Sequence, residues 1–222
     1  LRQWKGDVES HDTQGLAHRG QWPGGRSNHY LFDMNRDWFI LSQPETRARV
    51  RAIVEYHPQL VVDAHEMGSS STYFFNPPRE PINPVVPAEI EKWWDIFSQN
   101  QAEAFDARGW SYYTDEDFDE WYPGYGSSWP YYTGAIAILY EQASTGGTKV
   151  MRPEGKTLSF SEAVAHQFTS SLANIATLAT HRKDILSDYH RIRKDQVETD
   201  DPKTYFLVPE DNPTRVKKLV RV

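Results

Sequence analysis

Three polar residues with complementary chemistry stand at or just after the ends of short apolar runs. They are Arg36, His65 and Glu141. An imidazole can bind a metal ion, a carboxylate can act as a general base, and a guanidinium can hold a substrate carboxylate through paired hydrogen bonds. Because open α/β sheets build their sites at the carboxyl ends of strands, these residues are expected to converge. Three such strand ends indicate a site more strongly than any one of them.

Each of the three residues also has a purely structural interpretation. His65 can be a hydrogen-bonded structural histidine. Glu141 can be a solvated strand end instead of a base whose pKa is raised by a partly apolar pocket. Arg36 can form a salt bridge with Asp33 or Asp37. The residues alone leave these alternatives open.

The neighbours of His65 on its strand are divided between the two faces of a sheet. Side chains alternate along a strand, so Asp63 is expected on the same side as His65 and Glu66 on the opposite side. Asp63 can therefore hydrogen-bond a neighbouring polar group, whereas Glu66 need not share a ligand with His65.

Apolar spacing predicts helices that alternate with buried strands. The helices are expected over residues 45–57, about 90–109 and 159 to about 194. The last begins at a capping-box pattern and continues through Val164, Phe168, Leu172, Ile175 and Leu178. The strands are expected over residues 29–34, 60–62 and 135–140, and the second suits burial on both faces. The alternation predicts the α/β class, with a mostly parallel or mixed sheet flanked by helices.

Two segments between these elements are expected to be irregular. Residues 76–87 contain five prolines, which exclude regular structure. Residues 110–134 mix aromatic residues with Asp, Gly and Pro, which predicts a long surface segment of the kind that is often functional.

The composition limits the possible partners. With 222 residues and a formal net charge of -7, the chain is expected to form one sizeable domain without the basic surface that nucleic acid or an anionic membrane requires. No apolar run reaches the roughly 18 residues of a membrane span. Because the chain has no cysteine, any metal must be held by His, Asp or Glu.

Several short blocks together point to a known family. They are Asp33-Met34-Asn35-Arg36-Asp37-Trp38, Asp63-Ala64-His65, and Trp129-Pro130-Tyr131-Tyr132-Thr133-Gly134-Ala135 leading to Glu141. In these blocks and their order, the chain resembles the zinc metallocarboxypeptidases of the carboxypeptidase A type. Each block is weak alone, and the specificity comes from their occurrence together at strand ends.

The resemblance implies roles for individual residues. Asn35 and Arg36 would bind the free terminal carboxylate of a peptide substrate. Glu141 would be the general base that takes a proton from zinc-bound water and passes it to the leaving amine. His65 would be the third ligand of one catalytic zinc ion, after a His and a Glu from a His-x-x-Glu motif. Asp33 would orient the first zinc-binding histidine by accepting its hydrogen bond.

Two further roles in the family fall on more than one residue here. The tyrosine that closes over the substrate would be Tyr122 or Tyr125, and the arginine that stabilises the oxyanion would be Arg26 or Arg19. Family members commonly act outside the cytoplasm, so the resemblance implies secretion or a periplasmic location.

The chain departs from the family in its first metal ligands. The family's His-x-x-Glu motif precedes the Asn-Arg block, but no histidine before Asn35 is followed by Glu at that spacing. We therefore expect residues 1–202 to be the C-terminal portion of a catalytic domain whose N-terminal part is missing. Residues 203–222 are expected to begin a following segment. The fragment itself is expected to be inactive.

Two other functions remain open. An amidase or deacylase of the same broad fold would act on a cell-wall peptide or an acylated amino acid, whose carboxylate Asn35 and Arg36 could also bind. A non-catalytic peptide-binding module would keep the pocket and lose the metal. A His-x-x-Glu motif upstream of Leu1 would favour the enzyme.

Overall fold

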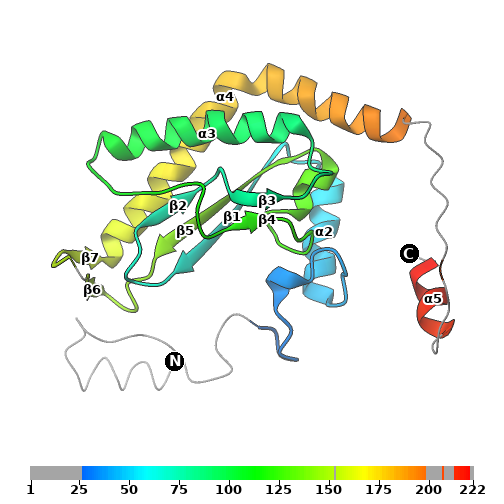
Figure 1. Ribbon diagram of the computed structural model, residues 1–222, viewed down its shortest axis with the longest axis horizontal. Coiled ribbons are helices and arrows are strands. Elements are labelled where there is room, and N and C mark those ends of the chain that lie inside the picture. Colours follow the sequence, from blue (N-terminus) through cyan, green and yellow to red (C-terminus); the bar gives the residue numbers. More distant parts are fainter. Residues whose placement is uncertain (1–26, 153, 199–206, 208–212, 221–222) are drawn as a thin grey trace.

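A mixed three-stranded sheet forms the centre of the computed structural model. The described residues are 27–152, 154–198, 207 and 213–220. The strand order is β1 (Leu60–Met67), β5 (Ile136–Ala143) and β2 (Tyr73–Phe75). β1 runs parallel to β5, and β2 runs antiparallel to it. Helices flank the sheet (Figure 1), so the predicted α/β class with a mixed sheet is confirmed.

Two long helices, α3 (Ala88–Asp106) and α4 (Phe160–Glu198), build the core together with the sheet. The two helices lie across one another over the strands (Figure 1). α3 carries bulky apolar residues at helical spacing, and all are buried: Ile90, Trp93, Trp94, Phe97 and Phe105. Trp94 Nε1 donates to the carbonyl of Ala137 in β5 at 3.0 Å. Aromatic side chains therefore supply much of the core and attach α3 to the sheet.

Shorter elements surround this core. They are η1 (Met34–Arg36), α2 (Pro44–Tyr56), β3 (Arg79–Ile82), β4 (Asp119–Glu120), η2 (Trp129–Thr133), β6 (Lys149–Met151), β7 (Thr157–Ser159) and α5 (Pro213–Val220). α2 ends at Tyr56, and the next residue, His57, caps it with a left-handed φ of 49°. α4 begins as predicted, because Ser159 Oγ accepts the N–H of Glu162 at 3.1 Å.

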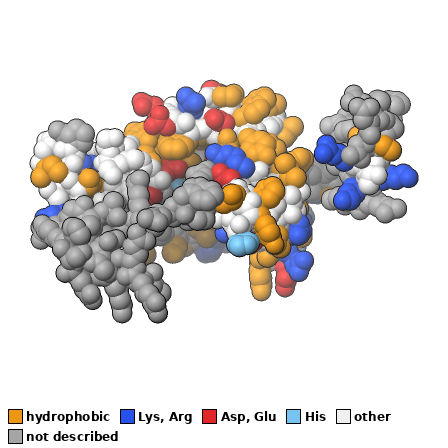
Figure 2. All heavy atoms as spheres, turned by 90° about the horizontal axis from the view of Figure 1, so that it is seen from below, with side chains coloured by type: hydrophobic (Ala, Val, Ile, Leu, Met, Phe, Trp, Pro, Cys, Tyr) orange, Lys and Arg blue, Asp and Glu red, His pale blue; other side chains and the backbone are white. Residues whose placement is uncertain are grey.

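The C-terminal elements lie near the limit of the described chain. α5 carries a group of basic side chains that is visible at the right of Figure 2.

In the part of the chain that the structure describes, no helix combines the length and apolar character needed to cross a membrane.

The predicted strand over residues 29–34 is wrong. Asn28 Oδ1 accepts the N–H groups of Tyr30 and Phe32, each at 3.0 Å, and this turns the chain. Leu31 has a φ of 66°, which no strand allows. A single bridge joins Ser27 to Asp33, and η1 follows. The apolar side chains of this segment are exposed, so there is no packing to hold them in a strand.

The predicted burial of the 60–62 strand on both faces is also wrong. β1 is an edge strand among the described residues, and its side chains alternate between exposed and half-buried. Val62 is 39 % exposed. β5, in contrast, is buried along its whole length because it lies between two strands and packs against α3 and α4. The continuous apolar run therefore identified the strand but not its place in the sheet.

The proline-rich segment contains a strand where none was predicted. β3 includes Pro81 and pairs in parallel with the short strand β4. Proline is tolerated there because β3 belongs to a two-stranded pair, where a missing N–H can face away from the partner.

Both sheet strands that carry site residues are also longer than predicted, so His65 and Glu141 lie inside the strands, near their carboxyl ends.

Candidate active site

The pairing of β1 with β5 brings His65 and Glu141 together. The two residues are direct partners in adjacent parallel strands. Neighbouring strands lie about 4.8 Å apart, and paired residues in a parallel sheet project to the same face. Both side chains accordingly line one pocket. The register of two strands thus places an imidazole beside a carboxylate.

This pocket has a volume of about 260 Å³. Its lining residues are Asn35, Arg36, His65, Asp117, Phe118, Asp119, Tyr125, Ser127, Leu139 and Glu141. They come from η1, from β1, from β5 and from the segment over residues 117–127. The predicted convergence of the Asn-Arg pair, the histidine and the glutamate on one cleft is therefore observed.

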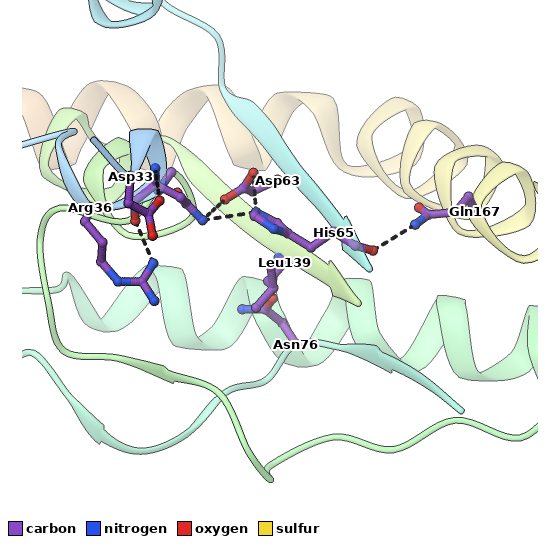
Figure 3. Close-up of polar contacts among 9 residues, drawn as sticks. Asp33, Arg36, Asp63, His65, Asn76, Leu139 and Gln167 are labelled. Atoms are coloured by element: carbon purple, nitrogen blue, oxygen red, sulfur yellow. Dashed lines mark hydrogen bonds and ion pairs between the residues drawn. The ribbon is translucent and has the colours of Figure 1, made fainter. Parts of the chain in front are cut away.

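His65 is held in one orientation by its neighbours. Its Nε2 lies 2.9 Å from Asp63 Oδ1 and 3.1 Å from Asn35 Nδ2. A carboxylate only accepts hydrogen bonds, so we assign the proton to Nε2, which donates to Asp63. The His65 carbonyl also accepts from Gln167 Nε2 of α4 at 3.4 Å (Figure 3). The expectation that Asp63 lies on the same side and bonds a neighbour is confirmed.

Asn35 joins three parts of the site. Its Nδ2 donates to Asp63 Oδ2 at 3.3 Å, and its Oδ1 accepts the N–H of Gly126 at 2.6 Å. Its backbone N–H donates to Asp33 Oδ1 at 2.8 Å, so Asp33 caps the η1 turn (Figure 3). Asn35 therefore connects η1, β1 and the 117–127 wall of the pocket.

Arg36 lies against two tyrosines that the sequence left undistinguished. Its guanidinium stacks over the Tyr125 ring at 4.5 Å and donates to the Asn35 carbonyl at 2.8 Å. Tyr122 instead donates its hydroxyl to the Arg36 carbonyl at 2.9 Å. Tyr125 lines the pocket, whereas Tyr122 supports the backbone beneath it. The Asp37 carboxylate is occupied by Ser42 and Gln43 and is not the partner of Arg36.

Glu141 is not a solvated strand end. Its side chain is 8 % exposed, and Phe74 of β2 pairs with it on the side away from β1. The N–H of Leu139, two residues earlier, donates to Asn76 Oδ1 at 2.7 Å, which fixes this part of β5 (Figure 3). A carboxylate is therefore held at the pocket wall with little access to bulk water.

A second carboxylate, Glu120, lies behind the pocket and was not identified from the sequence. It is 1 % exposed and accepts a hydrogen bond from the Ser128 hydroxyl. Burial raises its pKa to about 7, against lowering by the hydroxyls of Ser127 and Ser128. Two residues next to this buried pair line the pocket: Asp119, which directly precedes Glu120, and Ser127, which directly precedes Ser128. Protonation of Glu120 therefore affects the stability of the pocket wall.

Replacing Glu120 by glutamine is expected to change how stability depends on pH. The folded protein keeps a proton on Glu120 that the unfolded chain releases between its ordinary pKa of 4.5 and about 7. The wild type therefore loses stability as pH rises through this range. Urea unfolding should show Glu120→Gln gaining stability relative to wild type between about pH 5 and about pH 8. The exposed Glu91→Gln control should show no such change, and a pH-independent difference for Glu120→Gln would contradict the assignment.

Several predicted residues cannot be placed. Arg26 and Arg19, the two oxyanion candidates, lie outside the described residues. Of the following segment expected over residues 203–222, the structure describes residue 207 and the helix α5. The division at residue 202 stays a prediction.

The described residues do not fit a complete zinc site. Within them, no group of three or more His, Asp or Glu side chains is placed to hold a metal ion. His65 is the predicted ligand that the structure describes, and its Nε2 is engaged by Asp63. A metal would therefore be bound through Nδ1, in the common arrangement in which a carboxylate holds the other ring nitrogen.

Part of the pocket lining was missed by sequence reasoning. Four lining residues belong to the 110–134 segment: Asp117, Phe118, Asp119 and Ser127. The sequence predicted that this segment is functional, but it indicated a role only for Tyr122 and Tyr125. Leu139 precedes Glu141 by two positions, and strand alternation could have placed it on the same face. No local signal indicates which part of a long loop will reach the sheet.

Comparison with known proteins supports the fold. No protein-family model and no curated protein sequence matches this chain. Among solved structures, it is similar to a metallo-carboxypeptidase from Burkholderia cenocepacia, with a TM-score of 0.54 and 16 % sequence identity. The likeness covers 70 % of this chain and 40 % of that chain, so this chain spans well under two thirds of its neighbour's length. The described residues therefore form a carboxypeptidase-like α/β fold.

Proposed function

We propose that this chain is part of a metal-dependent carboxypeptidase that removes the terminal residue of a peptide. The observation that carries the proposal is the single pocket that contains both Arg36 and the register pair of His65 and Glu141. The similarity of the fold to a metallo-carboxypeptidase supports it. By the intact protein we mean the natural polypeptide in which residues 1–222 occur.

Arg36 is the residue that would bind the substrate carboxylate. Among the described residues, it is the only Lys or Arg that lines the pocket. Stacking on Tyr125 and the bond to the Asn35 carbonyl hold its guanidinium in place. A planar, oriented guanidinium can bind a carboxylate through two hydrogen bonds and would select chain ends over chain interiors. Asn35, whose side chain already bonds Asp63 and Gly126, would position this clamp and border the same carboxylate.

Glu141 is the residue that would act on the attacking water. A buried carboxylate that faces the pocket can accept a proton from water as the water oxygen adds to the scissile carbonyl carbon. The C–N bond then breaks, and the proton passes from Glu141 to the leaving amine. Tyr125 lies over the guanidinium at the pocket wall and would close the site around the terminal residue.

A zinc ion would supply the Lewis acid for this reaction. When bound in related enzymes, zinc polarises a carbonyl and lowers the pKa of its water to about 7. Of the ligands, the described residues supply His65, which Asp63 orients. The remaining ligands of the proposed enzyme would have to come from outside the described residues.

Replacing Arg36 by alanine in the intact protein tests the proposed clamp. We expect the Michaelis constant for a short peptide with a free C-terminal carboxylate to rise at least about tenfold, because a charged hydrogen-bonded pair is lost. A substrate with an amidated end should be affected little. The measurement is steady-state kinetics on the matched pair of substrates.

The exposed Arg51 of α2 provides a control of the same residue type. Arg51→Ala should leave both Michaelis constants unchanged. If Arg36→Ala impaired both substrates equally while the protein stayed folded, the terminal-carboxylate clamp would be wrong. An amidase, or a binding module without turnover, would then be the better interpretation.

A further inference from the structure

The pocket contains two carboxylates that the reaction proposed above does not use. Asp117 and Asp119 line it together with Glu141, so that three carboxylates face the single guanidinium of Arg36 among the described residues. Glu141 would act on the attacking water, and Arg36 would bind the substrate carboxylate. Once that carboxylate is in place, the charges of Asp117 and Asp119 have no positive counterpart in the described lining.

No described basic side chain neutralises these two carboxylates. In the described part of the chain, neither Asp117 nor Asp119 forms an ion pair with a lysine or arginine. Arg79 of β3 is the register partner of Asp119, but it lines a different cavity. Asp117 is exposed at the rim of the pocket, and Asp119 is half-buried. A cleft lined by charges of one sign concentrates their field, so this part of the pocket attracts a cation.

Asp119 is held close to the proposed carboxylate clamp. Alternation along β4 buries Glu120 and leaves Asp119 in the pocket wall. Asp119 Oδ1 accepts the N–H of Trp121 at 3.0 Å. Burial raises the pKa of Tyr125, while the charge of Arg36 lowers it and that of Asp119 raises it. Asp119 and Arg36 therefore both lie near the Tyr125 ring, within the span of one substrate residue.

Asp117 is held on the side of the proposed base. The Tyr113 hydroxyl donates to Asp117 Oδ2 at 3.0 Å. Burial raises the pKa of Tyr113, and the charges of Asp117 and Glu141 act in the same direction. Between the two aspartates, the ring of Phe118 packs against Phe74 at 4.9 Å between centroids. This packing fixes the segment that presents both carboxylates to the pocket.

The remaining lining suits a long side chain that ends in a cation. Phe118 and Leu139 add apolar surface next to the carboxylates. Lysine and arginine combine an apolar stem with a charged end, so they can pack on such surface and still reach an acid. We propose that the pocket accepts a basic terminal residue, lysine or arginine, with its side-chain cation at Asp119 and Asp117. The inference rests on the proposed function, through the role of Arg36, and adds the class of side chain that is removed.

Steady-state kinetics on the intact protein test the inference with two matched substrates. N-acetyl-glycyl-lysine and N-acetyl-glycyl-norleucine have unbranched side chains with the same number of carbons, and they differ in the ammonium group. We expect kcat/KM to be at least about tenfold higher for the lysine peptide, because the apolar side chain leaves both carboxylates without a cation. Raising the ionic strength should reduce this ratio.

Three substitutions assign the selectivity to the pocket. Asp119→Asn and Asp117→Asn each remove one charge with little change in size, and asparagine tolerates the φ of 59° at position 117. Each should lower the ratio of kcat/KM for lysine over norleucine at least about threefold. Glu116→Gln removes a charge from an exposed residue of the same segment that does not line the pocket. It should leave the ratio unchanged.

Isothermal titration separates the inference from the hydrolase assignment. L-lysine and L-norleucine carry the same α-carboxylate and have no bond that a peptidase can cleave. The intact protein should bind L-lysine more tightly than L-norleucine, and Asp119→Asn should reduce the difference. If this selectivity is found without hydrolysis of either peptide, the hydrolase assignment is wrong and the inference about the pocket stands.

Other results would overturn the inference. Equal kcat/KM for the two peptides in an active enzyme would show that the pocket does not recognise a side-chain cation, and so would equal affinities for the two amino acids. A ratio that both aspartate variants leave unchanged would place the recognition elsewhere. If removal of the acetyl group were needed for a high kcat/KM, the two carboxylates would bind the amine of the substrate instead.

Discussion

Replacing Glu141 by glutamine in the intact protein is expected to lower the turnover of a peptide substrate by at least about a hundredfold. Glutamine has the size of glutamate and can occupy the same place at the wall of the pocket, where the side chain is 8 % exposed. It cannot accept and return the proton of the attacking water. The protein should therefore remain folded and bind substrate while the chemical step fails.

Steady-state kinetics and thermal unfolding together check this prediction. The same change at an exposed glutamate, Glu91→Gln in α3, should leave turnover and the unfolding midpoint unchanged. The zinc content of the intact Glu141→Gln protein should equal that of wild type, because Glu141 is proposed as a base and not as a ligand. Turnover within a few-fold of wild type would exclude Glu141 as the general base, and lost zinc would assign it to the metal.

Replacing Gly126 by alanine is expected to disturb the site as strongly as a change in a side chain that carries chemistry. A Cβ at this position would lie 2.7 Å from Asp63 Oδ2 and 3.0 Å from Asn35 Oδ1. Both oxygens belong to the network that orients His65. Movement of about 1 Å in such a site can reduce activity about a hundredfold, and overpacking destabilises a protein by about 1–3 kcal/mol.

Gly68, at the end of β1, provides a matched control. No atom lies within 4 Å of a Cβ built there, so Gly68→Ala should be tolerated. kcat/KM of the intact protein and the free energy of unfolding should fall for Gly126→Ala and change little for Gly68→Ala. Wild-type values for Gly126→Ala would show that the 117–127 wall adapts freely and does not hold Asn35 in place.

Much of the fold could be predicted because its signals are local. The spacing of Ile90, Trp93, Trp94 and Phe97 marks α3, and the capping pattern at Ser159 marks the beginning of α4. Strand alternation placed Asp63 and His65 on one face correctly. These predictions need only the geometry of one helix or one strand. The prediction of a strand over residues 29–34 was wrong because the Asn28 side chain accepts two backbone N–H groups there. These local hydrogen bonds turn the chain and outweigh its strand propensity.

The site itself divides between what is local and what is not. The amino-acid sequence alone determined which chemical groups are available and that His65 and Glu141 stand near strand ends. The tertiary structure decided that these two residues are register partners and that Tyr125 lines the pocket while Tyr122 supports its backbone. It also left Phe168, Leu172 and Ile175 of α4 exposed. It also buried Glu120 behind the pocket wall and raised its pKa. The physical reason is that register, burial and the choice of helix face depend on contacts between segments far apart in the chain, and the periodicity of one segment carries no information about the segment that will pack against it.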